Sequence, residues 1–185
     1  MNRVRGHKRR IGVWIIVAWV IWYWCGGSEY LNHCWFYRID YRPLITYYAQ
    51  KNELPPELVA AVIYTESRFV ADARSSRGAV GLMQLMPDTA DWIAEQQGTQ
   101  VRSLQDPEEN IRLGTWYLRY LRTHFSSPDM ALAAYNAGHG HVENWLSAAE
   151  KADVSLGVDS IPFPETREFV KSVTQRQEEY RKHWQ

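Results

Sequence analysis

Prolines placed where helices begin constrain the fold of this chain more than any other feature of its sequence. Proline is tolerated in the first turn of an α-helix, where its missing N–H leaves no hydrogen bond unmade. The predicted helices run from Pro43 to about Asn52, from Pro55-Pro56 through Glu66, from Pro87-Asp88 to Gly98, from Pro107 through Leu121, and from Pro128 through Tyr135. Because no run of residues alternates as a strand would, the sequence predicts a predominantly α fold.

Two further helices are expected near the C-terminus, at residues 141–149 and in the final segment. The final helix carries one stripe of larger side chains, namely Phe169, Val173, Gln177, Tyr180 and Trp184. The clearest helix start is DPEEN at 106–110, with Asp106 as N-cap and Glu109 in the third position, as in a capping box. The helix that follows should bury Ile111, Gly114, Leu118 and Leu121. Residues 69–86 and 150–164 are expected to be irregular.

The N-terminus has a different composition. Residues 1–10 contain five basic residues and no acid, and residues 11–25 (IGVWIIVAWVIWYWC) carry no charge. A membrane span needs roughly 20 apolar residues, so this run is short, but the flanking Arg9 and Arg10 can reach the interface and the Trp22–Trp24 aromatics suit the far interface. We expect a cytoplasmic segment at 1–10, a single-pass membrane anchor at 11–25, a tether at 26–42 and an extracytoplasmic domain at 43–185. A signal segment cleaved near CGGS (25–28) is the alternative.

Charge and cysteine content exclude several classes of protein. The chain has no formal net charge, but the basic start leaves the rest with a net charge of −5, which argues against a nucleic-acid partner. Cys25 and Cys34 are too few for a disulfide framework or a metal cage. His139 and His141, in GHGH, lack an evident third ligand, so we expect a solvated loop there and no metal.

One carboxylate stands where the core pattern calls for an apolar residue. In VAAVIYTESRF (59–69), Leu58, Val62 and Glu66 share one helix face. Most glutamates at helix ends face solvent. A glutamate held against apolar neighbours would instead have a raised pKa and act as a general acid near neutral pH.

Two other segments carry polar groups among small or apolar residues. SSRGAVGLMQLMP (75–87) has Gly78 and Gly81 for a close-approaching backbone, and Gln84 stands between apolar pairs. Such an amide is either satisfied within the loop or available to a ligand. In AYNAGHGHVENW (134–145), Tyr135 and Asn136 end a helix of small residues, where they either cap the helix or face a cleft.

Taken together, ESRFVADARSSRGAVGLMQLMP, AYNAG and IPFPETREFV, in this order, resemble the catalytic domain of soluble-type lytic transglycosylases, which cleave bacterial peptidoglycan. The resemblance covers roughly residues 40–184 and implies a lysozyme-like domain, in an α+β superfamily with little strand. It implies that Glu66 is the sole catalytic acid and base. It further implies that substrate is bound by Ser75, Gln84, Met86, Tyr135, Asn136 and Glu165, with Tyr135 hydrogen-bonding around the catalytic carboxyl. Val70-Ala71 departs from the Asn-Pro frequent in the family.

The spacing of acids offers a separate indication of mechanism. Two-carboxylate glycosidases place the second acid roughly 5–9 Å from the first, yet no acidic residue lies between Asp72 and Asp88. Asp72 has a surface-like context, and Glu165 remains an open alternative. A single carboxyl favours a route assisted by the substrate's own N-acetyl group, with Glu66 as acid and then base, forming a 1,6-anhydromuramoyl end without a cofactor.

These observations leave three candidate functions. The first is a membrane-anchored murein lytic transglycosylase that cleaves the MurNAc-GlcNAc β-1,4 bond of peptidoglycan glycan strands. The second is a lysozyme-type hydrolase on the same fold, and the third an inactive glycan-binding protein of the envelope. A monomer is favoured, although the sequence leaves the oligomeric state open.

Overall fold

The computed structural model describes residues 39–184. Residues 1–38 and 185 lie outside the described part, and with them the predictions of a basic segment, an anchor at 11–25 and most of the tether. The chain divides into two units, residues 1–38 and 39–185. Within residues 39–184 no helix is long and apolar enough to cross a membrane.

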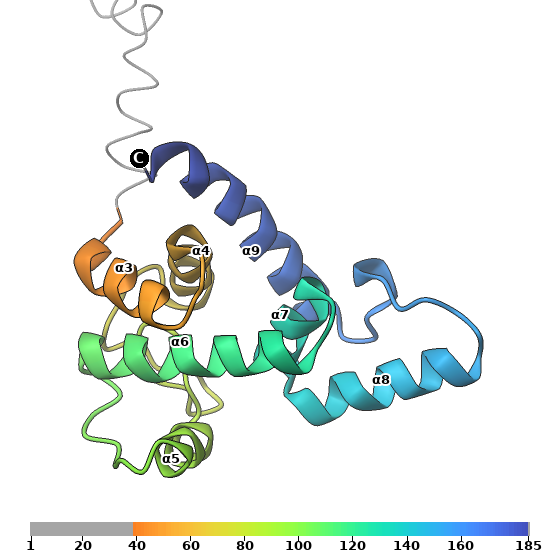
Figure 1. Ribbon diagram of the computed structural model, residues 1–185, viewed down its shortest axis with the longest axis horizontal. Helices are drawn as coiled ribbons and strands as arrows, with labels where there is room; N and C mark the ends of the chain where they lie inside the picture. Colours follow the sequence, from red (N-terminus) through yellow and green to blue (C-terminus); the bar gives the residue numbers. More distant parts are fainter. Residues whose placement is uncertain (1–38, 185) are drawn as a thin grey trace, which may run out of the picture. The chain divides into compact units, whose positions relative to one another are not determined.

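Seven α-helices and one 3-10 turn make up the described residues (Figure 1). Their bounds are α3 Arg42–Lys51, α4 Pro56–Ser67, α5 Pro87–Gln96, α6 Pro107–His124, α7 Pro128–Ala137, α8 His139–Lys151, η2 Val158–Ser160 and α9 Pro164–His183. The described segment contains no strand, only isolated β-bridges that join Val80 to Arg74 and to Leu85. The predicted helical fold is therefore confirmed, and the five helices predicted to begin at prolines all form.

Helix α4 forms the centre of the domain. Its residues 58–63 are all buried, so the helix is apolar on every side over this stretch, as expected for a core helix. It packs chiefly against α9 and also against α3, while α6 packs against α3, α5 and α7. Figure 1 shows α6 crossing the domain below α3 and α4, with α9 running along the far side of α4. The last turn of α4, which carries Glu66, thus projects from a rigid core.

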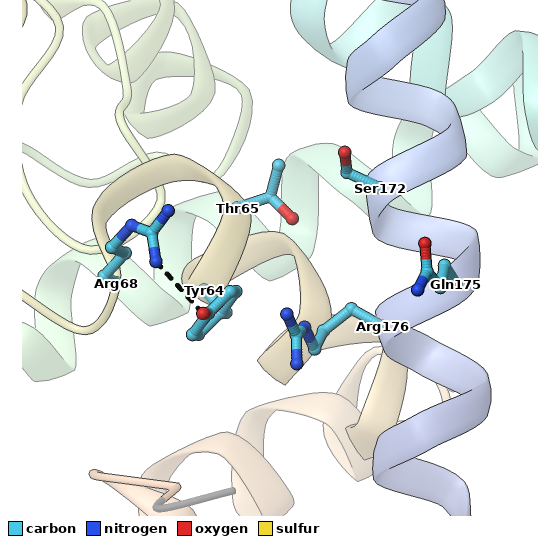
Figure 2. A pocket seen from close by; sticks show the side chains of 6 residues that line it. All are labelled: Tyr64, Thr65, Arg68, Ser172, Gln175 and Arg176. Carbon is cyan, nitrogen blue, oxygen red and sulfur yellow. Dashed lines mark hydrogen bonds between the residues drawn. The ribbon is translucent and has the colours of Figure 1, made fainter. Parts of the chain in front are cut away.

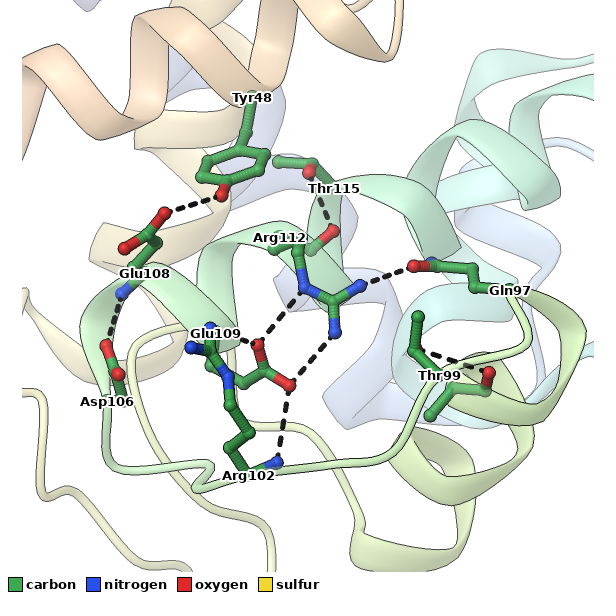
Figure 3. A network of polar contacts seen from close by, with 10 residues as sticks. Tyr48, Gln97, Thr99, Arg102, Asp106, Glu108, Glu109, Arg112 and Thr115 are labelled. Carbon is green, nitrogen blue, oxygen red and sulfur yellow. Dashed lines mark hydrogen bonds and ion pairs between the residues drawn. The ribbon is translucent and has the colours of Figure 1, made fainter.

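Helix α6 begins as predicted, but its glutamate has a different role. The Asp106 carboxylate accepts a hydrogen bond from the Glu108 N–H at 2.9 Å, and the predicted face, Ile111, Gly114, Leu118 and Leu121, is buried. The expected capping box is wrong, because the Asp106 N–H donates to the Ser103 carbonyl instead. Glu109 is fully buried between Arg102 and Arg112, with nitrogen–oxygen distances of 3.0 and 2.9 Å (Figure 3).

Two expectations for the C-terminal third need correction. The GHGH segment is not a loop, because α8 begins at His139. The imidazole of His141 stacks with Trp145 and makes an edge-to-face contact with Phe163. The stretch 150–164 is not wholly irregular, since it contains the end of α8 and the turn η2. On α9, Phe169 and two other members of the predicted stripe, Val173 and Tyr180, are buried, whereas Gln177 and Trp184 are half-buried.

Candidate functional site

A cleft of about 300 Å³ opens at the end of α4. It is bounded by that helix end, by the α4–α5 loop, by α6, by the end of α7 and by the start of α9. All seven site residues singled out from the sequence line it, namely Glu66, Ser75, Gln84, Met86, Tyr135, Asn136 and Glu165. Four segments that are far apart in the sequence therefore converge on one cavity. Their proposed roles in binding and catalysis remain predictions.

Glu66 lies half-buried in this cleft. Burial and, to a smaller extent, the negative charge of Glu165 raise the pKa of its carboxyl from 4.5 to about 8. A carboxyl with such a pKa is protonated at neutral pH, because removal from water disfavours the charged form. The group can therefore donate a proton at a pH where an ordinary glutamate cannot.

The chain turns sharply directly after Glu66. Arg68 and Phe69 both have left-handed backbones, with φ of 51° and 64°, a conformation that costs L-residues free energy. The turn is held by Ser67, which is buried and whose Oγ lies 2.7 Å from the Leu82 carbonyl oxygen and 3.1 Å from that of Ile63. Strained backbone maintained by its surroundings is common at functional sites. Ser67 thus joins the helix that carries Glu66 to the loop that forms the cleft wall.

The side-chain amide nitrogen of Gln84 forms hydrogen bonds within the loop. Its Nε2 donates to the carbonyl oxygens of Gly81 at 2.8 Å and Ala73 at 3.2 Å, and its backbone is left-handed with φ of 47°. Both alternatives raised for this amide therefore apply to different atoms: the N–H groups are satisfied within the loop, and the residue lines the cleft. The side-chain oxygen is the atom that remains to meet a ligand.

Asn110 fixes the same loop from α6, and sequence reasoning missed it. This fully buried side chain accepts a hydrogen bond from the Met83 N–H at 2.7 Å and donates to the carbonyl oxygens of Val80 at 2.9 Å and Leu104 at 2.8 Å. Gly81 has φ of +85° and packs so closely on Asn110 that a Cβ there would clash. A polar residue within the apolar α6 pattern was the available signal.

Tyr135 and Asn136 are both engaged by neighbouring residues. The Tyr135 hydroxyl donates to the Met83 carbonyl at 2.8 Å, so the structure gives its hydrogen bond to the loop and not to the Glu66 carboxyl. Burial raises the pKa of Tyr135 well above 10, and the charge of Glu66 adds to this. The Asn136 Oδ1 accepts from the Thr166 hydroxyl at 2.8 Å, which leaves the amide N–H groups as its cleft-facing donors.

The rim of the cleft is more exposed. The Ser75 Oγ accepts a hydrogen bond from the Ala79 N–H at 3.0 Å, and Met86 is 40% exposed. Glu165 forms an ion pair with Arg77 at 3.1 Å, between two side chains that are largely exposed. Arg77 lines the cleft and was also missed, because an exposed arginine in a loop carries no pattern of its own.

The position of Glu165 changes the expectation of a single carboxyl. Asp72 does not line the cleft, as expected, but Glu165 does, and its charge acts on the Glu66 carboxyl. The cleft therefore contains two carboxylates in different states. Glu66 is half-buried with a raised pKa, whereas Glu165 is exposed and paired with an arginine.

A helical, lysozyme-like domain with one glutamate of raised pKa in a polar cleft has the arrangement that general acid catalysis requires. The family model of the transglycosylase SLT domain matches residues 43–156 of this chain. The chain belongs to this family, and the resemblance inferred from the sequence motifs is confirmed.

Relatives and solved structures agree with this assignment. The soluble lytic murein transglycosylase of Escherichia coli K12 is 39% identical over 141 residues, which cover 73% of this chain and 22% of the relative. The membrane-bound lytic murein transglycosylase F of Desulfosudis oleivorans is 35% identical, over 74% of this chain and 30% of the relative. The chain thus spans between a fifth and a third of the length of these relatives.

Two crystal structures have the same fold as the described domain. The 70 kDa soluble lytic transglycosylase of Escherichia coli superposes with a TM-score of 0.73 at 36% identity, over 80% of this chain and 25% of that protein. The inactive glutamate-to-glutamine mutant of the lytic transglycosylase Slt from Pseudomonas aeruginosa gives a TM-score of 0.67 at 35% identity, over 75% of this chain and 23% of that protein.

Proposed function

We propose that this protein is a murein lytic transglycosylase that cleaves the MurNAc-GlcNAc β-1,4 bond of peptidoglycan and forms a 1,6-anhydromuramoyl end. The observation that carries the proposal is the Glu66 carboxyl, protonated at neutral pH and set in a cleft with the six other residues that the family motifs single out. The Pseudomonas aeruginosa relative is described as an inactive mutant that carries a glutamate-to-glutamine exchange. Loss of activity on such an exchange is what we expect of a family whose catalysis depends on one glutamate.

In the first step, Glu66 acts as the general acid. Its proton passes to the glycosidic oxygen, and the bond between that oxygen and C1 of the muramoyl residue breaks. The carbonyl oxygen of the substrate's own N-acetyl group stabilises the positive charge that develops at C1. The leaving sugar departs with a free 4-hydroxyl group. A pKa of about 8 suits this step, because most Glu66 carboxyls still carry a proton at pH 7.

In the second step, the same residue acts as the base. The Glu66 carboxylate takes the proton of the muramoyl 6-hydroxyl while its oxygen attacks C1, which closes the 1,6-anhydro ring. The proton balance is then restored, and no water is consumed. A carboxylate in a poorly hydrated site has a strong tendency to regain a proton, so the burial that makes Glu66 an acid in the first step also favours this return.

The loop around the cleft would supply the substrate contacts. The Gln84 side-chain oxygen and the Asn136 N–H groups are the polar atoms left after their internal hydrogen bonds are counted. Ser75, Met86 and Glu165 line the more open part of the cleft, where a sugar or its peptide stem would leave it. Tyr135 supports the Met83 carbonyl and so fixes the wall beside Glu66.

A lysozyme-type hydrolase is the second candidate, and one observation favours it. Glu165 shares the cleft with Glu66, and a second carboxylate is what a hydrolytic route would use to activate water. Against this role, the Glu165 side chain is largely exposed and its carboxylate is already engaged by Arg77. The transglycosylase route uses only the carboxyl that the cleft perturbs.

We also propose a location for the protein in the bacterial cell membrane. Residues 11–25 would form a single-pass anchor, with residues 1–10 in the cytoplasm and the domain at 43–185 on the outer side, where peptidoglycan lies. Support comes from the uncharged run flanked by arginines and from relatives named membrane-bound lytic murein transglycosylases. An anchor of this kind would hold the domain within reach of its proposed substrate.

Mass spectrometry of the muropeptides released from purified murein tests the function. We expect products with anhydromuramoyl ends, each lighter by one water than the corresponding hydrolysis product. Reducing ends that incorporate heavy oxygen from labelled water would establish the hydrolase instead. Release of no product by the full chain would leave only a glycan-binding role. Glu66→Gln serves as the matched inactive control.

A further inference from the structure

A second polar pocket lies on the other side of α4. Its volume is about 290 Å³, and it is lined by Tyr64, Thr65 and Arg68 at the end of α4 and by Ser172, Gln175 and Arg176 on α9 (Figure 2). It shares no lining residue with the cleft that contains Glu66. Among its side chains only Arg68 lies within the family motifs, and the resemblance gives it no role. The pocket is therefore a separate feature that the proposed reaction does not use.

Two guanidinium groups meet at this pocket on either side of one aromatic ring. Arg68 lies 5.3 Å and Arg176 4.2 Å from the centre of the Tyr64 ring. Arg68 also donates to the Tyr64 hydroxyl at 3.0 Å, and Figure 2 shows Tyr64 between the two arginines. Stacking and the hydrogen bond restrain both side chains, so little conformational entropy remains to be lost when a ligand binds.

The charge at the pocket is positive and only partly balanced. None of its six lining residues is acidic. Arg176 lies 2.7 Å from a carboxylate oxygen of Glu179, but among residues 39–184 no carboxylate forms an ion pair with Arg68. Two like charges beside one ring repel each other, and an anion bound in the pocket would relieve that repulsion.

The other lining groups suit a small polar ligand. The Thr65 hydroxyl donates to the Ala61 carbonyl at 2.8 Å, which leaves its oxygen lone pairs to accept a hydrogen bond. Ser172 lies exposed on α9 and can donate or accept. Gln175 adds a side-chain amide, whose nitrogen donates to Glu179 at 3.2 Å. The C-terminal end of a peptide has a carboxylate, which arginines can bind, and a peptide N–H and C=O, which hydroxyl and amide groups can bind.

We propose that this pocket binds the terminal carboxylate of a short peptide. The planar guanidinium fork matches a carboxylate in two parallel hydrogen bonds, and the hydroxyl groups can meet the adjoining peptide N–H and C=O. The volume lies at the small end of the range for ligand pockets, which limits the occupant to one or two amino acids. The choice of a peptide as the source rests on the proposed function, because the substrate carries peptide stems.

The test is a titration of the full chain that follows the Nε–H NMR signals of Arg68 and Arg176. The probes are N-acetyl-alanyl-alanine, the same dipeptide with its C-terminus amidated, and inorganic phosphate. We expect the free acid to shift both signals and the amide to leave them in place. Arg68→Gln removes a charged hydrogen-bond donor and should weaken binding of the acid about tenfold or more. Ser172→Glu places a carboxylate in the pocket and should abolish it.

Lys182→Gln is the matched control, since it removes one exposed positive charge from α9 outside the pocket and should leave the affinity unchanged. Equal binding of the amidated dipeptide would overturn the carboxylate assignment, as would binding of phosphate without binding of the acid. Unchanged affinity in the Ser172→Glu variant would overturn the location. Because the titration needs no turnover, its failure would leave murein cleavage untouched, and absence of anhydro products would leave the titration result standing.

Discussion

Replacing Glu66 by glutamine should make the protein inactive and, at alkaline pH, more stable. The wild-type carboxyl has an ordinary pKa of 4.5 when the chain is unfolded and a pKa of about 8 in the fold. Between these two values the folded protein holds a proton that the unfolded chain has released. The free energy of unfolding therefore falls as pH rises through this window and levels off above it. Glutamine fills almost the same space and does not titrate, so the variant lacks this loss.

The pKa difference sets the size of the effect. Each unit of pKa difference corresponds to about 1.4 kcal/mol, so the span from 4.5 to about 8 gives an upper limit of about 5 kcal/mol at pH 9. Glu66 is only half-buried, and water in the cleft reduces this amount. We expect Glu66→Gln to exceed the wild type in stability by at least about 1 kcal/mol at pH 9 and to match it near pH 4. For a domain of this size the former corresponds to about 2–4 °C in melting temperature.

Thermal unfolding of both proteins at a series of pH values measures this difference, and release of soluble muropeptides from murein measures turnover. General acid–base groups contribute about 10²–10⁴-fold, and Glu66 fills both roles, so the loss of rate should lie at the top of this range or above it. Glu95→Gln, at an exposed position on α5, controls for the loss of one charge. A pH-independent stability difference would refute the raised pKa. A variant that keeps more than about a tenth of the rate would refute the catalytic role.

Three further perturbations follow from the structure. Glu165→Gln removes the negative charge that raises the Glu66 pKa, so the alkaline limb of the pH profile of kcat/KM should move to lower pH; a limb that stays in place would contradict the coupling. Asn110→Ala leaves the Met83 N–H and two carbonyl groups without partners, and should cost about 2–5 kcal/mol of stability by chemical denaturation and lower kcat more than it changes KM. Removal of residues 1–27 should yield a soluble protein that still releases muropeptides from murein, and aggregation without activity would contradict the proposed tether.

The helices could be predicted from the sequence because their starts are local events. Proline at a first turn, and Asp106 or Ser127 as an N-cap, act on the next two or three peptide groups only, so the signal does not depend on the rest of the fold. The start of α8 at His139 was missed because it lacks a local signal of this kind. Gly138, with φ of 92° and ψ of 140°, both ends α7 and precedes the first residue of α8, and no capping side chain marks the second helix.

The residues that support the cleft could not be found in this way, because their partners are distant in sequence. Asn110 bonds to Met83 and Val80, 27 and 30 positions earlier, and Arg77 pairs with Glu165, 88 positions later. Pairings of this kind depend on how helices pack, which no local pattern encodes. The family motifs identified Glu66 and its neighbours because they describe a site already assembled.

The contrast between Glu66 and Glu109 shows what separates a reactive carboxyl from a structural one. Burial acts to raise the pKa of both, and for Glu66 the charge of Glu165 adds to it. For Glu109, hydrogen bonds from Arg112 and Arg102 outweigh burial and lower the pKa (Figure 3). Two arginines thus keep Glu109 ionised as a brace between α6 and the loop before it. Glu66 has the Glu165 carboxylate nearby instead, so burial, the larger cause, raises its pKa unopposed, and the carboxyl keeps its proton at neutral pH.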